Sequence, residues 1–275
     1  MVRTIFCFFL CTSCLGLQDR TSRVPLQNKG TATTLSILTF NIMTSVDLLG
    51  LQHYAPWIQR KAEVLRTIEV QNADLLSIQE CSPGQLRELR ARLKDVYTVV
   101  ANVNFTPDAI VAFKKDRFTL LERGHWSLGN PYMPLFRRIA IWVKLEDKVS
   151  GRQFLFVGTH LDGRPIKNQQ AENIKSKLQD EQGSGAPLLL AGDFNIAPDE
   201  KGYPILLSDG WKDTFSAGKP DVRTFPRHHP LRRIDHVLFF GSQVHMEQWH
   251  TVGLQSSRIS DHFPVWVQVR LDAAL

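Results

Sequence analysis

Carboxylate, amide and imidazole side chains stand where apolar segments of this sequence end or begin. Taken singly, an Asp or Asn at such a place is commonly a turn former. The ordered set is more informative, because hard divalent cations prefer carboxylate and amide oxygens, and such cations assist the hydrolysis of phosphate esters. The set therefore points to metal-assisted chemistry on a phosphate ester. Its members are Asn41, Glu80, His160, Asp193, Asn195, Asp235, Asp261 and His262.

Apolar runs and helical periodicity indicate which elements would position these residues. Helices are predicted at 56–72, from Ser82-Pro83-Gly84-Gln85 onward, where Ser82 and Gln85 form a capping box, and at 167–179. Strands are predicted at 35–40, 74–78, 109–113, 139–145, 154–159, 188–191, 234–240 and 263–271. The mixture predicts an α/β or α+β fold of packed sheets with outer helices.

Composition limits the class of protein. The chain has 275 residues with a formal net charge of +6, and no apolar run approaches the ~20 residues of a membrane-spanning helix. The ordinary content of charged and apolar residues excludes a disordered, collagenous or coiled-coil protein. A mildly basic chain suits an anionic ligand but names no partner. We expect a monomer.

The first residues have the pattern of an export signal. A single Arg3 precedes a short run rich in Ile, Phe, Leu and Cys, and Leu10-Cys11-Thr12-Ser13-Cys14 resembles a bacterial lipobox. We therefore predict a signal peptide or lipoprotein signal at 1–21, a linker at 22–34 and one domain at 35–272. The protein would be periplasmic, secreted, or tethered to a membrane through a lipid on Cys14.

Six segments resemble, in order, the motifs of the endonuclease/exonuclease/phosphatase superfamily. They are Phe40-Asn41, Gln79-Glu80, Thr159-His160-Leu161-Asp162, Gly192-Asp193-Phe194-Asn195, Arg233-Ile234-Asp235-His236 and Ser260-Asp261-His262. The chain as a whole resembles an exported bacterial member of that superfamily. The resemblance implies a DNase I-like four-layer sandwich, with two packed mixed β-sheets flanked by helices. It also implies a site at one edge of that sandwich.

The resemblance assigns a metal site for Mg²⁺ or Mn²⁺. Glu80 would be the principal ligand, with Asn41 beside it and Asp261 assisting. Asp193 and Asn195 are two residues apart, so in an extended backbone their side chains would point the same way. Asp193 could then activate the attacking water, and Asn195 could donate to a phosphoryl oxygen.

The same resemblance places imidazoles on the scissile phosphate. His262 would contact it, Asp235 would hold the His262 ring, and His160 would supply a second donor. Arg137 or Arg138 could reach a phosphate oxygen. Met43 stands where some DNA-repair relatives carry an additional acidic ligand, which disfavours that specificity.

The substrate remains open at this level. We predict a phosphodiester, either a lipid head group or a nucleic acid. The alternatives are a phosphomonoesterase of the same superfamily and a non-catalytic surface binding protein on this scaffold. A calcineurin-like phosphoesterase is disfavoured, because its Asp-x-His and Gly-Asn-His motifs are absent. The basic run at 227–233 is interpreted as a solvated hairpin, and His245 and His250 lack the spacing of zinc ligands.

Overall fold

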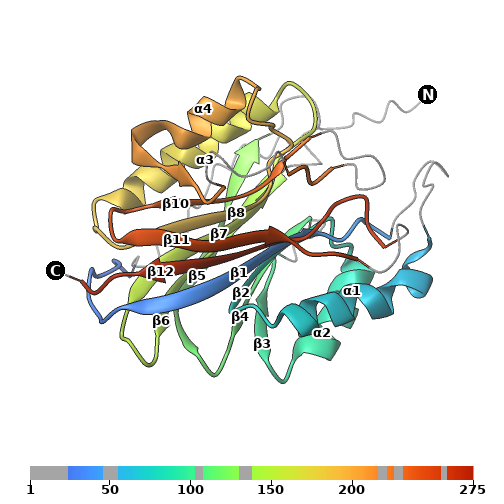
Figure 1. Cartoon of the computed structure of the whole chain (residues 1–275), viewed down its shortest axis with the longest axis horizontal. Helices are drawn as coiled ribbons and strands as arrows, with labels where there is room; N and C mark the ends of the chain where they lie inside the picture. Colours follow the sequence, from blue (N-terminus) through green and yellow to red (C-terminus); the bar gives the residue numbers. More distant parts are fainter. Residues whose placement is uncertain are drawn as a thin grey trace, which may run out of the picture.

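The structure, a computed structural model, describes residues 24–45, 55–102, 108–129, 138–215, 222–225, 232–254 and 259–274. Within them the chain forms two six-stranded sheets. Figure 1 shows these sheets packed against each other, with one pair of helices on each outer side. The predicted sandwich of two mixed sheets flanked by helices is therefore confirmed. The predicted signal segment at 1–21 lies outside the described residues.

The first sheet has the strand order β11-β12-β1-β2-β4-β3. The strands are β11 (Val244–Thr251), β12 (Val265–Leu271), β1 (Thr33–Asn41), β2 (Leu75–Gln79), β4 (Ala109–Lys114) and β3 (Tyr97–Val100). β1 and β2 are parallel, and the other pairings are antiparallel. Both faces of this sheet are covered at the centre, which explains why all five residues of β2 are buried rather than every second one.

The second sheet has the order β5-β6-β7-β8-β10-β9. Its strands are β5 (Phe118–Gly129), β6 (Arg138–Asp147), β7 (Gln153–His160), β8 (Leu188–Asp193), β10 (Asp235–Phe240) and β9 (Lys212–Asp213). Only β7 and β8 pair in parallel. Apolar side chains from both sheets form the central core, among them Ile37, Val111, Phe156 and Val267.

Helices α1 (Trp57–Gln71) and α2 (Pro83–Leu93) cover the first sheet, while α3 (Lys167–Gln182) and α4 (Gly202–Leu207) cover the second. The predicted capping box of α2 is present, since the Ser82 hydroxyl accepts from Gln85 N and the Gln85 side chain accepts from Ser82 N. No described helix is long and apolar enough to cross a membrane.

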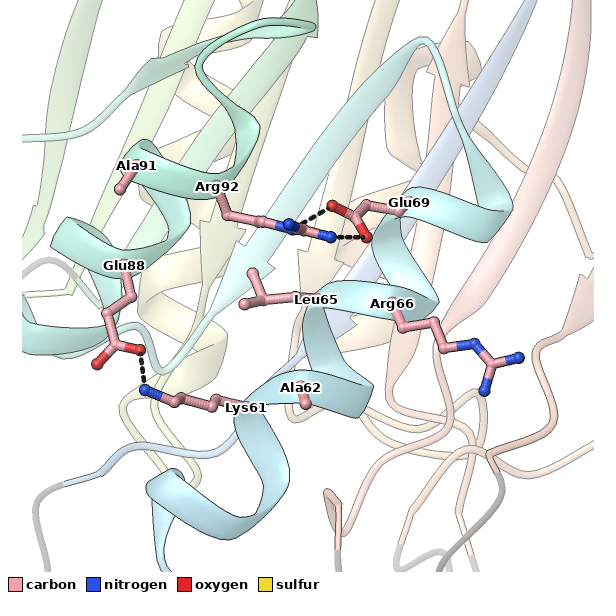
Figure 2. Close-up of a pocket in the computed structure, with 8 residues that line it drawn as sticks. All are labelled: Lys61, Ala62, Leu65, Arg66, Glu69, Glu88, Ala91 and Arg92. Carbon is pink, nitrogen blue, oxygen red and sulfur yellow. Dashed lines mark hydrogen bonds and ion pairs between the residues drawn. The ribbon is translucent and has the colours of Figure 1, made fainter.

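Two ion pairs join the exposed sides of α1 and α2. Lys61 pairs with Glu88 at 3.0 Å and Arg92 with Glu69 at 2.6 Å, and Leu65 lies between them (Figure 2). Exposed pairs of this kind contribute little stability. Burial of apolar side chains such as Val64, Ile68, Leu86 and Leu89, at about 1.5–3 kcal/mol each, holds these helices to the sheet.

The segment before β1 lies against the second sheet. Leu26 is buried, and the side chain of Asn28 accepts a hydrogen bond from Arg152 at 2.7 Å. Lys144, only 2% exposed, donates to the carbonyl of Val24. Residues 24–32, which fall in the predicted linker, therefore have fixed contacts with the body of the domain.

Candidate active site

The strand directions bring the predicted site residues to one edge of the sandwich. β1 and β2 are parallel, with Asn41 opposite Gln79, so the chain leaves both strands at the same edge. β7 and β8 are also parallel, with His160 opposite Asp193. β10 runs the other way and begins at that edge, with Asp235 opposite Asp193. Asp261 and His262 lie a few residues before β12, which is antiparallel to β1.

The amide of Asn41 joins the two sheets across this edge. Its Nδ2 donates to Glu80 Oε1 at 3.1 Å and to Asp193 Oδ2 at 3.0 Å, and it lies 3.4 Å from His262 Nε2. Asn41 Oδ1 accepts from Met43 N. Because Asn41 is only 1% exposed, its amide is a fixed donor that aligns carboxylates from both sheets.

The Asp193 carboxylate is surrounded by donors. Its Oδ1 accepts from Asn195 N at 2.9 Å, while Oδ2 lies 3.5 Å from His160 Nε2 and 3.6 Å from His262 Nε2. Gly192 is required just before it, because a Cβ there would lie 2.1 Å from the carbonyl oxygen of Thr159. The glycine thus lets β8 lie against β7 and places Asp193 between the two imidazoles.

Asn195 reaches the site by a route that differs from the expected one. β8 ends at Asp193, and Asn195 has a φ of 52°, so the extended-backbone argument for its direction was wrong. A turn brings it back instead: Nδ2 donates to the carbonyl of Leu161 and lies 3.3 Å from His160 Nε2. Asn tolerates this left-handed backbone better than most residues.

Asp235 and His262 form the predicted pair. His262 Nδ1 lies 2.9 Å from Asp235 Oδ2, and both side chains are buried. Burial alone would lower the pKa of His262, but the carboxylates of Asp235 and Asp193 raise it to about 10. The ring is therefore a cation at neutral pH, held with its Nε2 toward Asp193.

His160 belongs to a second charged group that includes a residue missed by sequence reasoning. Asp108 Oδ1 lies 3.1 Å from His160 Nδ1, and Arg138 pairs with the same carboxylate. Burial and the charge of Arg138 oppose protonation of His160, but Asp108 and Asp193 outweigh them and raise its pKa. Burial would raise the pKa of Asp108, yet His160 and Arg138 hold it well below its usual range.

Asp108 could have been found from its position. It stands directly before the predicted strand 109–113, and β4 is antiparallel to β2, so its start lies at the site edge. Arg138, one of the two candidate arginines, is at this edge and paired with Asp108. Arg137 lies outside the described residues.

The predicted metal ligands gather on the first-sheet side of the site. Glu80 follows β2 with a φ of 56°, and its Oε2 accepts from Thr44 N at 3.1 Å. Burial raises the pKa of Asp261, and the charges of Glu80 and Asp193 add to that rise. Like charges gathered in this way are stabilised when a cation binds among them, so the donor set fits a hard divalent cation.

A second group of atoms that could bind a metal lies on the second-sheet side of the site. One atom each from Asp193, Asp235 and His262 lies within 4.8 Å of the others. One contact in this trio, His262 Nδ1 to Asp235 Oδ2, is itself a hydrogen bond. The described residues thus offer an acidic and imidazole cluster next to the predicted ligands Glu80, Asn41 and Asp261.

Three charged residues support the turn at Asn195, and none of them was predicted. Lys167 Nζ donates to the carbonyl of Asn195 at 2.7 Å and to Glu200 Oε1 at 2.8 Å. Arg232 pairs with the other oxygen of Glu200 and lies 3.5 Å from the same carbonyl. Nothing local in the sequence signals these contacts, because each joins residues about thirty positions apart.

The basic run at 227–233 is described only at Arg232 and Arg233. Arg233 donates to Asp213 at 2.7 Å and lies 2.7 Å from Nδ1 of His236 in β10. An antiparallel bridge joins Phe225 and Arg232, as a hairpin requires. Arg232 is partly exposed and pairs with Glu200, whereas Arg233 is buried against Asp213, so the expectation of a solvated run was wrong for Arg233.

Comparison with known proteins gives a consistent result. Residues 38–262 match the sequence profile of the Endonuclease/Exonuclease/phosphatase family. Nocturnin of Mus musculus is 29% identical over 189 residues, which are 62% of this chain and 44% of nocturnin. The chain therefore spans less than half the length of that relative.

Solved structures share the fold. An endonuclease/exonuclease/phosphatase from Bacteroides vulgatus has a TM-score of 0.74 at 24% identity, covering 87% of this chain and 100% of that one. The mannosyl-6-phosphatase Bt3783 of Bacteroides thetaiotaomicron has a TM-score of 0.71 at 21% identity, covering 86% and 99%. At these identities the comparison establishes the shared architecture.

Proposed function

The chain belongs to the endonuclease/exonuclease/phosphatase family, whose members hydrolyse phosphate esters, and from that membership we propose that it is a metal-dependent phosphoesterase. It hydrolyses a phosphate ester by in-line attack of an activated water, and its substrate is a phosphodiester of a lipid head group or a nucleic acid. One observation carries this proposal: the Asp193 carboxylate lies within 3.6 Å of both the His160 and His262 imidazoles.

Asp193 is the base. Its Oδ2 faces the space between the two imidazoles, while its Oδ1 is held by Asn195 N. A carboxylate fixed in this way can orient a water and take its proton as the oxygen attacks phosphorus. The Asn41 amide keeps the carboxylate in position from the opposite sheet.

The phosphate is bound by the cationic and amide groups around Asp193. His262, with a pKa raised to about 10 by Asp235 and Asp193 despite its burial, carries a positive charge at neutral pH. His160 adds a second imidazole, and the Asn195 amide lies 3.3 Å from it. Fixed donors of this kind stabilise negative charge that develops on phosphoryl oxygens.

We assign the metal to Glu80, with Asn41 and Asp261 beside it, and propose Mg²⁺ or Mn²⁺. Such a cation would neutralise charge on the phosphate and leaving oxygens. The chain's own contribution is to hold the Glu80 carboxylate, whose two oxygens accept from Asn41 Nδ2 and Thr44 N. In this assignment the cluster of Asp193, Asp235 and His262 does not bind the metal. Asp193 orients the water, and the Asp235–His262 pair contacts the phosphate.

The test is a substrate panel with the full chain and added Mg²⁺. Bis-p-nitrophenyl phosphate, plasmid DNA, sphingomyelin and inositol phosphates distinguish diesters from monoesters and lipids from nucleic acids. We expect diester hydrolysis that EDTA abolishes and Mg²⁺ restores. His262→Ala should remove it, whereas His245→Ala, which changes an exposed histidine in β11, should not. Activity that is indifferent to EDTA, or that survives in His262→Ala, would contradict the proposal.

We also propose that the protein is exported and acts as a monomer, tethered through Cys14 or released. The sequence pattern at 1–21 is the support for export. Mass spectrometry of the native protein should then find an N-terminus near residues 14–22, with a lipid mass if Cys14 is acylated. A native protein that retains Met1 would contradict export.

A further inference from the structure

A basic cavity opens beside the active site, between the edge strands of the two sheets. It has a volume of about 360 Å³. Its walls include the side chains of Arg90, Arg123 and His125, and an apolar floor of Val100, Gly124 and Ile141. Arg90 comes from α2, and the other two basic residues come from β5.

Strand register explains why β5 carries basic groups here. Arg123 is opposite Val143 and His125 is opposite Ile141, and both apolar partners belong to the core between the sheets. Cross-strand partners share a face, so Arg123 and His125 lie on the inward face of this edge strand. Trp126, the next residue, is buried on the opposite face under α3.

The charges in this cavity are not balanced by acids. Among the residues that the structure describes, no acidic side chain lines the cavity. Within those residues, neither Arg90 nor Arg123 forms an ion pair. Several other arginines are paired with carboxylates, for example Arg92, Arg117 and Arg138. Two guanidinium groups over an apolar floor suit a phosphate, which they can bind through paired hydrogen bonds.

The cavity lies close to the catalytic residues along the same strands. Ile141 is three residues beyond Arg138 in β6, a distance of about 10 Å at the ordinary strand rise. Both Arg90 and Asp108 act electrostatically on the buried Cys81 side chain, which follows Glu80. The cavity and the catalytic edge are therefore neighbours.

We propose that this cavity is an anion subsite, built by Arg90, Arg123 and His125, that binds a phosphate group about 10 Å or more from the scissile phosphate. The proposal deepens the proposed function, since it favours substrates with more than one phosphate. A nucleic-acid strand carries one phosphate per roughly 3.4 Å along its axis, so about three nucleotides would span the gap. A free phosphate ion would use the same chemistry, and the two sources can be separated.

The first experiment measures binding without catalysis. Inorganic phosphate is titrated into the full chain in EDTA while the melting temperature is followed. A phosphate concentration ten times its Kd should raise the Tm by about 3 °C. The part of this rise that comes from the cavity should persist in Arg87→Ala, an exposed arginine on α2 outside the cavity, and be lost in the Arg90→Ala/Arg123→Ala double variant. Any rise from phosphate at the active-site imidazoles should remain in both variants. An equal rise in the double variant would overturn the subsite. Because no turnover is needed, this outcome is independent of the proposed function.

The second experiment identifies the source of the phosphate. In Mg²⁺, kcat/KM of the double variant should fall about tenfold on a short oligonucleotide, the loss expected for a charge-assisted contact. It should stay within twofold on bis-p-nitrophenyl phosphate, which carries a single phosphate, and Arg87→Ala should change neither. If the double variant loses the phosphate-dependent Tm rise but keeps its kcat/KM on the oligonucleotide, the subsite binds a free anion. If the double variant keeps both the Tm rise and the kcat/KM on the oligonucleotide, the proposal is overturned.

Discussion

Replacing Lys167 with methionine should reduce kcat/KM about tenfold while the fold remains intact. Lys167 Nζ donates to the carbonyl of Asn195 at 2.7 Å and to Glu200 at 2.8 Å, and the residue is 9% exposed. Methionine keeps the apolar stem and removes both hydrogen bonds. Asn195 would then be held in its left-handed backbone, with a φ of 52°, by fewer contacts.

The magnitude follows from those contacts. A hydrogen bond from a charged donor contributes about 1.5–3 kcal/mol, and a left-handed backbone at a residue other than glycine costs about 1–3 kcal/mol. Arg232 remains 3.5 Å from the same carbonyl and retains part of the restraint. A net loss of about 1–2 kcal/mol is therefore expected, which corresponds to roughly tenfold in kcat/KM.

The assay is steady-state hydrolysis of bis-p-nitrophenyl phosphate, with urea unfolding measured in parallel. Lys177→Met is the matched control, because Lys177 is an exposed residue of the same helix. If Lys167 acts through Asn195, then Lys167→Met should cost less than twofold in an Asn195→Ala background. Wild-type kcat/KM in Lys167→Met, or an undiminished tenfold loss in the double variant, would refute the reasoning.

Three further outcomes are expected. Asp193→Asn keeps the size of the side chain but removes the base, so kcat should fall roughly a thousandfold with a change in Tm of a few degrees at most; turnover near wild type would exclude Asp193 as the base. Burial would raise the pKa of Asp213, but His236 and Arg233 lower it. The unfolding free energy should therefore be largest above pH ~4, the ordinary pKa of Asp, and decline as pH falls. Asp213→Asn should flatten that decline in urea titrations at pH 3–6, and an unchanged slope would contradict the ion pair. Gly192→Ala places a methyl group 2.1 Å from a backbone carbonyl of β7, so the urea midpoint should drop by the equivalent of about 1–3 kcal/mol; an unaltered midpoint would contradict the packing argument.

The edge location of the site was predictable because it depends on local signals. A buried strand is visible as an apolar run, and the polar residue that ends the run marks where the chain leaves the sheet. Parallel pairing of β1 with β2 and of β7 with β8 then places Asn41, Glu80, His160 and Asp193 together. The family resemblance, confirmed by the match over residues 38–262, supplied the two-sheet arrangement that local signals lack.

The elements that were not predicted have weak or interrupted patterns. β5 contains irregularities between Leu120 and Glu122 and between Ser127 and Gly129, so its apolar alternation is broken twice. β9 has only two residues, and α4 contains a proline in a six-residue stretch. β11 exposes several of its side chains at the sheet edge. In each case tertiary pairing rather than local sequence determines the element.

Asp108 and Lys167 were missed for a related reason. Asp108 contacts His160 across 52 positions and Lys167 contacts Asn195 across 28, and nothing in the local sequence fixes such long-range register. The place of Asp108 at the site edge could be inferred from its position before β4, but its contact with His160, like the role of Lys167, is visible only when the partner is known. Residues that position catalytic groups through ion pairs are thus harder to predict than the catalytic groups themselves, which stand at strand ends.

The proposed site residues come from both sheets, so activity should depend on how the two sheets pack against each other. The first sheet carries Asn41 and Glu80, and the second carries His160, Asp193 and Asp235. Neither sheet alone brings Glu80, the proposed metal ligand, next to Asp193, the proposed base, so the proposed site forms only when the apolar core between the sheets is buried. The Asn41–Asp193 hydrogen bond of 3.0 Å and the bond of 2.9 Å from Ser77 to the carbonyl of Ala191 both cross that interface. A change in core packing that shifts one sheet along the other would therefore alter the distance between Glu80 and Asp193 before it unfolds the domain, and activity should be the more sensitive readout of core mutations.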